Sequence, residues 1–200
     1  MTSDTSFLLT GLGNPGREYR DSRHNVGFML VDRIAVRLNA RAMKVQSKAI
    51  VMTTMYEDRK LILAKPQTYM NLSGGSVRPL LERYGEGDAA NLIVASDEAA
   101  LPFGMIRVRG RGSAGGQKGL KSIIERIGSQ EFPRVRLGVK PDHPVSDLSS
   151  FVLSPIPKRD REALDRMLDR AADAVEAILI EGVERAMSLF NERVKQSSEA

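Results

Sequence analysis

Short apolar runs alternate along this chain with amphipathic segments of helical period, and this alternation constrains the fold more than any other feature. Apolar runs of about four to eight residues predict strands, whereas apolar residues recurring every third or fourth position predict helices. Strands interleaved with helices favour an α/β architecture with helices covering a central sheet. We find no internal repeat, linker or second domain, so we expect residues 1–200 to form a single α/β domain. Its twisted sheet should be mixed, largely parallel and flanked by helices.

The runs that predict strands are rich in Val, Ile, Leu, Met and Thr and are bounded by turn-forming residues. Two of them, residues 44–56 and 60–65, flank the turn-like EDRK and predict an antiparallel hairpin, which makes the expected sheet mixed. Another, NLIVAS, places Asp97 at the carboxyl end of a buried strand. The expected strands cover residues 7–9, 44–56, 60–65, 91–96, 104–110 and 133–139.

Helical periodicity separates these strands and also fills the last part of the chain. Asn25 is a favourable N-cap residue, so we expect the first helix to begin there. Gly182 interrupts the last periodic segment, which predicts two C-terminal helices. Residues 141–157 contain four prolines and no helical period, and we expect an irregular loop that could flank or cover a site. The expected helices cover residues 25–40, 75–84, 117–127, 164–179 and 186–194.

Length and composition limit the classes of protein to which this chain can belong. A chain of 200 residues buries about 70% of its unfolded surface, so a hydrophobic core alone can stabilise it. The absence of cysteine excludes disulfides, thiol nucleophiles and cysteine-based zinc sites, and it is compatible with a reducing cytoplasm. The opening MTSDTS has no basic segment and no long apolar run follows it, so we expect neither a signal peptide nor a membrane-spanning helix. We therefore expect a cytoplasmic protein without a membrane partner.

Positive charge is concentrated in one segment. The formal net charge of the chain is +5. Residues 101–142 carry nine Lys and Arg against three Asp and Glu, an excess of six that is larger than the excess of the whole chain. Such a block favours a polyanionic partner such as nucleic acid, although many proteins carry a basic surface that binds no RNA.

Two glycine-rich segments resemble nucleotide-binding loops in their letters. Gly11, Gly13 and Gly16 spell GxGxxG after a strand, but the expected helix begins about nine residues later, so the pyrophosphate would lack its helix N-terminus. We expect a tight loop instead. In GRGSAGGQKG, Gln117 stands where a phosphate-binding loop requires glycine, so we expect no nucleoside triphosphate site.

His24 is the more promising of the two histidines, because His143 lies in the proline-rich PDHP. His24 ends the loop that follows the first strand, where catalytic groups of open α/β sheets gather. With Asp97 it could form a general-base pair that activates water, although an Asp after a strand is often only a turn or cap residue. Asn14 and Asn71 could donate to an oxyanion, but their spacing alone favours ordinary Asx turns.

Three stretches of the chain resemble the bacterial-type peptidyl-tRNA hydrolase family. They are GLGNPGREYRDSRHNVGFMLVD (residues 11–32), KPQTYMNLSGGSV (residues 65–77) and the segment from DEAALPFG to RVRLGV (residues 97–139). Separate motifs in the right order are far more specific than a single GxGxxG. The resemblance implies one α/β domain that hydrolyses the ester between a peptide and the 3′ end of tRNA. It implies no metal and no organic cofactor.

The resemblance also implies roles for individual residues. His24 would be the general base that activates water, and Asp97 would orient it. Arg109 and Arg136 fall where the family binds the 5′ phosphate of tRNA, so the partner would be the acceptor stem and 3′ end of peptidyl-tRNA. The resemblance further suggests a monomer. The residues that would bind substrate or line the cleft are Asn14, Tyr19, Met70 and Asn71.

One departure from the family pattern concerns the glycine-rich loop. The usual GGHNG is GGQKG here, so Gln117 and Lys118 replace a histidine and an asparagine. Because an ammonium group cannot accept a hydrogen bond, Lys118 is expected to bind substrate in a different way. Relatives of this fold that bind RNA without catalysis make a non-catalytic RNA-binding module the alternative. The enzyme is favoured by the presence of His24, Asp97, Asn14 and Asn71.

Overall fold

The structure, a computed structural model, describes residues 6–191. Residues 1–5, on which the signal-peptide expectation partly rests, and Val194, expected in the last helix, lie outside the described residues. Among the described residues, no helix is both long enough and apolar enough to cross a membrane.

One seven-stranded sheet forms the centre of the molecule, in the order β2-β3-β4-β1-β5-β7-β6. The three central pairings, β4 with β1, β1 with β5 and β5 with β7, are parallel, and the outer pairings are antiparallel. The prediction of a mixed and largely parallel sheet is therefore confirmed. The strands are β1 (Phe7–Gly11), β2 (Arg41–Gln46), β3 (Ala49–Tyr56), β4 (Arg59–Pro66), β5 (Leu92–Pro102), β6 (Ile106–Arg109) and β7 (Arg134–Lys140).

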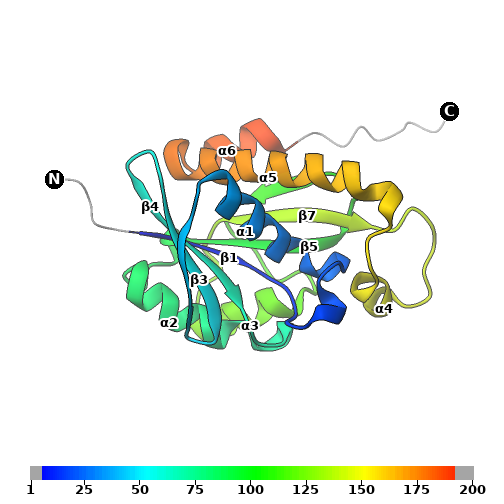
Figure 1. Cartoon of the computed structure of the whole chain (residues 1–200), viewed down its shortest axis with the longest axis horizontal. Coiled ribbons are helices and arrows are strands. Elements are labelled where there is room, and N and C mark those ends of the chain that lie inside the picture. The colour runs from blue at the N-terminus through cyan, green and yellow to red at the C-terminus, as the bar shows by residue number, and fades with distance from the viewer. Residues whose placement is uncertain (1–5, 192–200) are drawn as a thin grey trace.

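Helices cover both faces of this sheet, with α1, α5 and α6 on one face and α2 and α3 on the other (Figure 1). β1 shows why its sequence is an unbroken apolar run. Leu9 packs in the core beneath α1 and α5, Leu8 packs in the core beneath α2 and α3, and both are fully buried. The helices are α1 (Val26–Arg37), α2 (Gly74–Tyr84), α3 (Lys118–Ile127), α4 (Leu148–Leu153), α5 (Arg161–Glu181) and α6 (Val183–Phe190).

Short 3-10 helices carry several of the connections between these elements. Three of them hold residues that the sequence singled out, because Tyr19 lies in η1, His24 lies in η2, and Met70 and Asn71 lie in η3. The 3-10 helices are η1 (Arg17–Tyr19), η2 (Arg23–Asn25), η3 (Met70–Leu72), η4 (Ala89–Asn91) and η5 (Lys158–Asp160).

The predictions for two segments, residues 44–56 and 141–157, were wrong. Residues 44–56 are not one strand, because the chain turns at Ser47 and Lys48, whose φ angles are 49° and 56°, and β2, β3 and β4 form a three-stranded antiparallel unit. Neither residue is a Gly or Asn that would indicate a turn with positive φ. The segment 141–157 is not wholly irregular, because it contains α4, whose N-cap Asp147 accepts a hydrogen bond from the Ser149 N–H at 2.9 Å.

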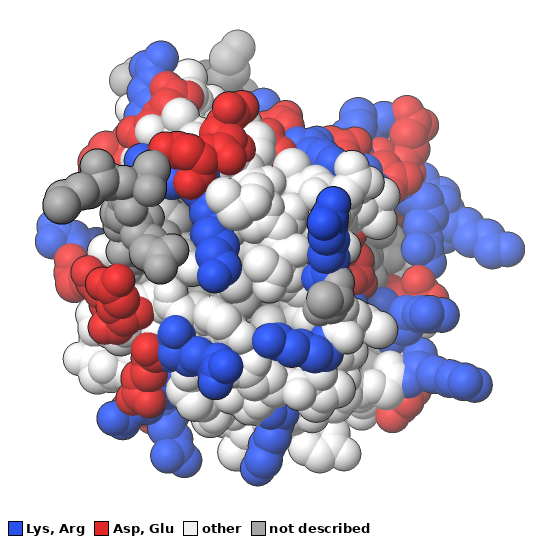
Figure 2. All heavy atoms as spheres, turned by 60° about the vertical axis from the view of Figure 1, so that its left-hand side comes forward, with Lys and Arg blue, Asp and Glu red and all other residues white. Residues whose placement is uncertain are grey.

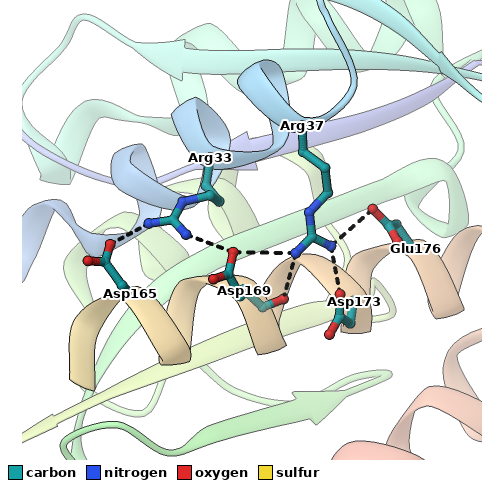
Figure 3. Close-up of polar contacts among 6 residues, drawn as sticks. All are labelled: Arg33, Arg37, Asp165, Asp169, Asp173 and Glu176. Carbon is teal, nitrogen blue, oxygen red and sulfur yellow. Dashed lines mark hydrogen bonds and ion pairs between the residues drawn. The ribbon is translucent and has the colours of Figure 1, made fainter. Parts of the chain in front are cut away.

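A network of ion pairs joins α1 to α5 (Figure 3). Arg37 Nη1 lies 2.6 Å from Asp173 Oδ1 and 3.3 Å from Glu176 Oε1, and Arg33 Nη1 lies 2.7 Å from Asp169 Oδ1. α1 begins two residues after His24. These ion pairs therefore also fix the helix that starts beside the site described below. The carboxylates of the network are Asp165, Asp169, Asp173 and Glu176.

Replacing Arg37 with methionine should lower the free energy of unfolding by about 1–2 kcal/mol at low salt, because it removes several partly exposed ion pairs of up to about 1 kcal/mol each. Urea unfolding measures the change. Arg166→Met is the matched control, since Arg166 forms one exposed pair with Glu162 on its own helix and should cost at most about 0.5 kcal/mol. The Arg37 effect should shrink in about 1 M NaCl. An effect that persists there would assign it to packing of the arginine stem.

Candidate active site

The site lies where β1 and β5 separate. Gly11, the last residue of β1, pairs with Ala95, and the Leu12 N–H donates to the Ala95 carbonyl at 2.9 Å before the chain leaves the sheet. Asp97 lies two residues after Ala95 in β5. It stands at the carboxyl end of the parallel pairing of β1 and β5, where ligands of open α/β sheets bind. The prediction that Asp97 ends its strand was wrong, because β5 continues to Pro102 along β7.

His24 and Asp97 form a hydrogen-bonded pair at this point. His24 Nδ1 lies 2.8 Å from Asp97 Oδ2, and the two side chains are 14% and 5% exposed. An ionised carboxylate only accepts hydrogen bonds, so the proton of a neutral ring belongs on Nδ1 and the lone pair on Nε2. Nε2 has no hydrogen-bond partner within residues 6–191 and can take a proton.

An amide network fixes the loop that faces His24. The Asn14 N–H donates to Asn25 Oδ1 at 2.9 Å, and Asn25 Nδ2 donates to the Asn14 carbonyl at 3.0 Å. Asn14 Oδ1 in turn accepts from the Met70 N–H at 2.8 Å, which leaves Asn14 Nδ2 with no partner in the described part of the chain. The sequence suggested that the Asn25 side chain caps α1, but it makes no such hydrogen bond. Asn25, the residue after His24, bonds instead to the GNPG loop.

His24 and Asp97 lie in a cleft of about 500 Å³. Polar groups reach it from the loops after β1, β4 and β6, and α4 adds the apolar side chains of Leu148, Val152 and Leu153. Arg23, the residue before His24, attaches to the C-terminal end of α4, since its Nη1 donates to Ser154 Oγ at 2.7 Å. Burial lowers the pKa of Arg23, although nearby Asp160 opposes this effect. The segment expected to be an irregular loop thus forms a wall of the cleft.

Most of the substrate-binding residues suggested by the sequence line this cleft. Asn14 and Met70 are buried in its floor, whereas Asn71 and Lys118 are exposed. Tyr19 is the exception, because it lies half-buried in η1 and is not among the residues that line the cleft. Asn14, Met70, Asn71 and Lys118 come from different loops, so the fold, rather than their spacing in the chain, brings them together.

The predicted phosphate-binding arginines lie beside the cleft on neighbouring strands. Arg136 of β7 stands directly opposite Arg107 of β6, while Arg109 is one diagonal step away on the same face of the sheet. Arg136 Nη1 donates to Glu98 Oε2 at 2.8 Å, and its buried Nε has no partner within the described residues. Arg107 and Arg136, with Lys140, line a hollow of about 450 Å³. The sequence missed Arg107 and Lys140 because strand register decides which arginines meet.

Arg134 is wholly buried and supports the glycine-rich loop. Arg134 donates to the Ser113 carbonyl at 2.7 Å and to the Gln130 carbonyl at 3.1 Å, and its guanidinium lies 4.3 Å from the centre of the Phe132 ring. Burial, and secondarily the neighbouring Arg136, lower the pKa of Arg134 to about 10, so it remains charged at neutral pH. Its charge adds to the positive potential beside the cleft.

The basic hollow beside the cleft differs in charge from another hollow of the molecule. A larger hollow of about 620 Å³ between β3 and α5 is lined by five carboxylates, which would repel an RNA backbone. Figure 2 shows another face, on which Lys and Arg are spread singly over an otherwise uncharged surface and Asp and Glu gather mainly toward its margins. The acidic side chains of the larger hollow are Glu57, Asp58, Asp173, Glu176 and Glu181.

Within residues 6–191, no group of three or more His, Asp or Glu side chains is arranged to hold a metal ion. The glycine-rich loop after β1 also lacks the geometry of a dinucleotide site. Gly16 is followed by η1, and α1 begins only at Val26. Gly11 instead permits close packing of β1 on α1, since a Cβ there would lie 2.2 Å from the Gly27 carbonyl oxygen.

The structure adds one residue to the immediate surroundings of Asp97. Gln117, noted in the sequence only as a departure from expected loop patterns, is the N-cap residue of α3, and its side-chain nitrogen donates to Asp97 Oδ1 at 2.9 Å. Its place at the start of a predicted helix was the only available signal, and glutamine is not a preferred N-cap residue.

Known proteins are similar to this chain over nearly its whole length. The family model described as peptidyl-tRNA hydrolase matches residues 8–199. The peptidyl-tRNA hydrolase of Solibacter usitatus is 46% identical over 187 residues, which cover 94% of this chain and 95% of that protein. That of Koribacter versatilis is 45% identical over 186 residues, covering 93% of this chain and 92% of that protein. The crystal structure of peptidyl-tRNA hydrolase from Acinetobacter baumannii has a TM-score of 0.85 at 32% identity, covering 96% of each chain.

Proposed function

Because this chain belongs to the peptidyl-tRNA hydrolase family, we propose that it hydrolyses the ester bond between a peptide and the 3′ end of tRNA. The observation that carries the proposal is the hydrogen bond between His24 and Asp97 at the floor of an open cleft. No observation favours the alternative of a non-catalytic RNA-binding module, because the general-base pair and the amide side chains of Asn14 and Asn71 line the same cleft.

In the proposed reaction, His24 is the general base. Its Nε2 takes a proton from a water molecule while the water oxygen bonds to the ester carbon. Asp97 holds the ring through Nδ1 and stabilises the imidazolium that forms. When the tetrahedral intermediate collapses, the bond to the ribose oxygen breaks and the imidazolium returns its proton to that oxygen. The products are a tRNA with a free terminal hydroxyl and a peptide carboxylic acid, which loses its proton to solvent at neutral pH.

Amide donors would bind the reacting end of the substrate. Asn14 Nδ2 has no partner within residues 6–191 and lies in the same cleft as His24, so it is available to a substrate carbonyl or to the developing oxyanion. Asn71 and Met70 would contact the peptide, and the exposed Lys118 would attract the RNA backbone or a carbonyl. Tyr19 would act at the margin, since it does not line the cleft.

The remainder of the tRNA would lie across the basic strands beside the cleft, with Arg109 and Arg136 on its acceptor stem and 5′ phosphate. Arg136 supports this assignment because it lines a hollow together with two further cations, Arg107 and Lys140. We propose that the enzyme acts as a monomer in the cytoplasm. The outward N–H and C=O groups of Val108 on edge strand β6 are bound by the side chain of Asn191, which discourages strand pairing with a second copy.

The activity can be tested with two substrates that differ only at the amino group. Purified protein is incubated with an N-blocked aminoacyl-tRNA, which has the amide of a peptidyl-tRNA, and separately with the unblocked aminoacyl-tRNA. We expect fast release of free tRNA from the blocked substrate alone. Binding of tRNA without any release would favour the RNA-binding module, and release from both substrates would contradict specificity for peptidyl-tRNA.

Replacing Arg136 or Arg109 with alanine should weaken tRNA binding and reduce the slope of log affinity against log salt by about 1 for each phosphate that the variant no longer binds. The measurement is a binding titration at several salt concentrations. Arg107→Ala identifies the position of the phosphate, because Arg107 lines the hollow with Arg136 and Arg109 does not. A phosphate in that hollow makes Arg107 more important than Arg109. An unchanged salt slope in all three variants would place the RNA elsewhere.

A further inference from the structure

Both oxygens of the Asp97 carboxylate are engaged, and only one of them by His24. Oδ2 lies 2.8 Å from His24 Nδ1, and Oδ1 accepts a hydrogen bond from Gln117 Nε2 at 2.9 Å. Asp97 is 6% exposed, so little water is available to replace either partner. Two fixed hydrogen bonds on opposite oxygens prevent the carboxylate from rotating about its terminal bond, and they therefore set the direction in which it presents Oδ2 to the imidazole.

The orientation of the Gln117 amide is itself fixed by α3. Gln117 Oε1 accepts a hydrogen bond from the Leu120 N–H at 2.9 Å, as an N-cap side chain does, so Nε2 has to point away from the helix. Nε2 then reaches Asp97 and also lies 3.2 Å from Met70 Sδ. Gly119 allows this packing, because a Cβ there would lie 2.6 Å from the same sulfur and 3.0 Å from Gln117 Oε1.

We propose that Gln117 is a positioning residue for the reaction, acting through Asp97 to hold His24 in the geometry of a general base. The inference rests on the proposed function and extends it to the glycine-rich loop and α3. A glutamine performs this role without titrating, which leaves His24 as the only histidine that lines the cleft among the described residues. Without Gln117, Asp97 Oδ1 would be a buried acceptor with no partner, and the carboxylate would be free to turn.

Two substitutions separate this role from simple capping of α3. Gln117→Ser keeps a favoured N-cap residue but cannot reach Asp97, whereas Gln117→Leu removes both hydrogen bonds. We expect both variants to lower kcat about 10- to 100-fold, the effect of losing a hydrogen bond to a charged group, with KM nearly unchanged. Gln117→Leu should lower the melting temperature more than Gln117→Ser, because it removes the cap of α3 as well as the hydrogen bond to Asp97. A serine variant with wild-type kcat would overturn the proposal and leave Gln117 as a helix cap alone.

A double-mutant cycle with Asp97→Ala tests whether Gln117 acts through Asp97. If it does, adding Gln117→Ser to Asp97→Ala should change the single-turnover rate less than about twofold, since the partner is already gone. A further loss as large as in the wild-type background would mean that Gln117 acts independently of Asp97, for example by binding the substrate itself, and would overturn the positioning role.

Gln117→Glu provides a readout that a purely structural role would not change. A carboxylate beside Asp97 favours the protonated forms of its neighbours, so the acidic limb of the profile of kcat against pH should move to higher pH. An unmoved limb would contradict the proposed interaction. Each assay requires wild-type release of tRNA from the blocked substrate, so failure of the proposed function appears in the wild type and failure of this inference appears only in the variants. The titratable groups that line the cleft with Gln117 are His24, Tyr69, Asp97, Glu98 and Lys118.

Discussion

Replacing His24 with alanine should lower kcat for the blocked substrate by about 10² to 10⁴-fold, the contribution of a positioned general base. Binding of tRNA and the melting temperature should change little, because the arginines proposed to bind phosphate lie on other elements and the His24 ring lines a cleft, where it is only partly buried. Release of tRNA measured at saturating substrate, with thermal unfolding in parallel, tests the prediction.

His143→Ala is the matched control for this experiment. His143 is the other histidine of the chain, its Nδ1 lies 2.6 Å from Asp142 Oδ1 on the surface, and it lines a different hollow. The hydrogen bond to His143 is the largest of the effects that lower the pKa of Asp142, and neither residue lines the cleft. The control should keep full activity. An unchanged kcat in His24→Ala would remove His24 as the base.

Replacing Gly27 with alanine should lower the free energy of unfolding by about 3 kcal/mol, at the upper end of the cost of overpacking a core. The reason is the close approach of α1 to the sheet. A Cβ on Gly27 would lie 2.5 Å from the Ala95 carbonyl oxygen and 2.5 Å from the Leu12 nitrogen, and these backbone atoms cannot move independently. Since Ala95 and Leu12 lie next to the site, displacement of α1 should also lower kcat below the unfolding temperature.

Gly75→Ala is the control for Gly27→Ala, and it should act in the opposite direction. Gly75 is also the second residue of a helix, α2, but a Cβ there would meet no atom within 4 Å. Alanine should therefore stabilise the protein by up to about 1 kcal/mol through helix propensity and a less flexible unfolded chain. Urea unfolding of both variants provides the comparison. Similar effects of the two substitutions would mean that the packing of α1 on the sheet relaxes easily.

Periodicity alone predicted most of the helices and strands. The expected helices at 75–84 and 117–127 differ from α2 and α3 by one residue at most, and the break at Gly182 separates α5 from α6. These predictions succeeded because the burial of one helix face or both strand faces leaves its pattern in consecutive residues. Asp147 shows what was overlooked, because an N-cap residue before the apolar LSSFVL is also a local signal for α4.

Contacts between distant segments could not be predicted in the same way. The continuation of β5 past Asp97 depends on pairing with β7, and the neighbour of Arg136 depends on the register of β6. A shift of one residue in that register would turn each side chain to the other face, and nothing in either strand alone specifies it.

The fold class, the family and the residue types available for catalysis follow from local pattern and from motifs in the amino-acid sequence. Which of those residues meet follows from the packing of the folded chain. That packing brought His24 and Asp97 together across 73 positions of chain and Gln117 to the other oxygen of Asp97 across 20. Such contacts depend on how β1, β5 and α3 pack, and packing is a property of the whole folded chain that no single segment encodes.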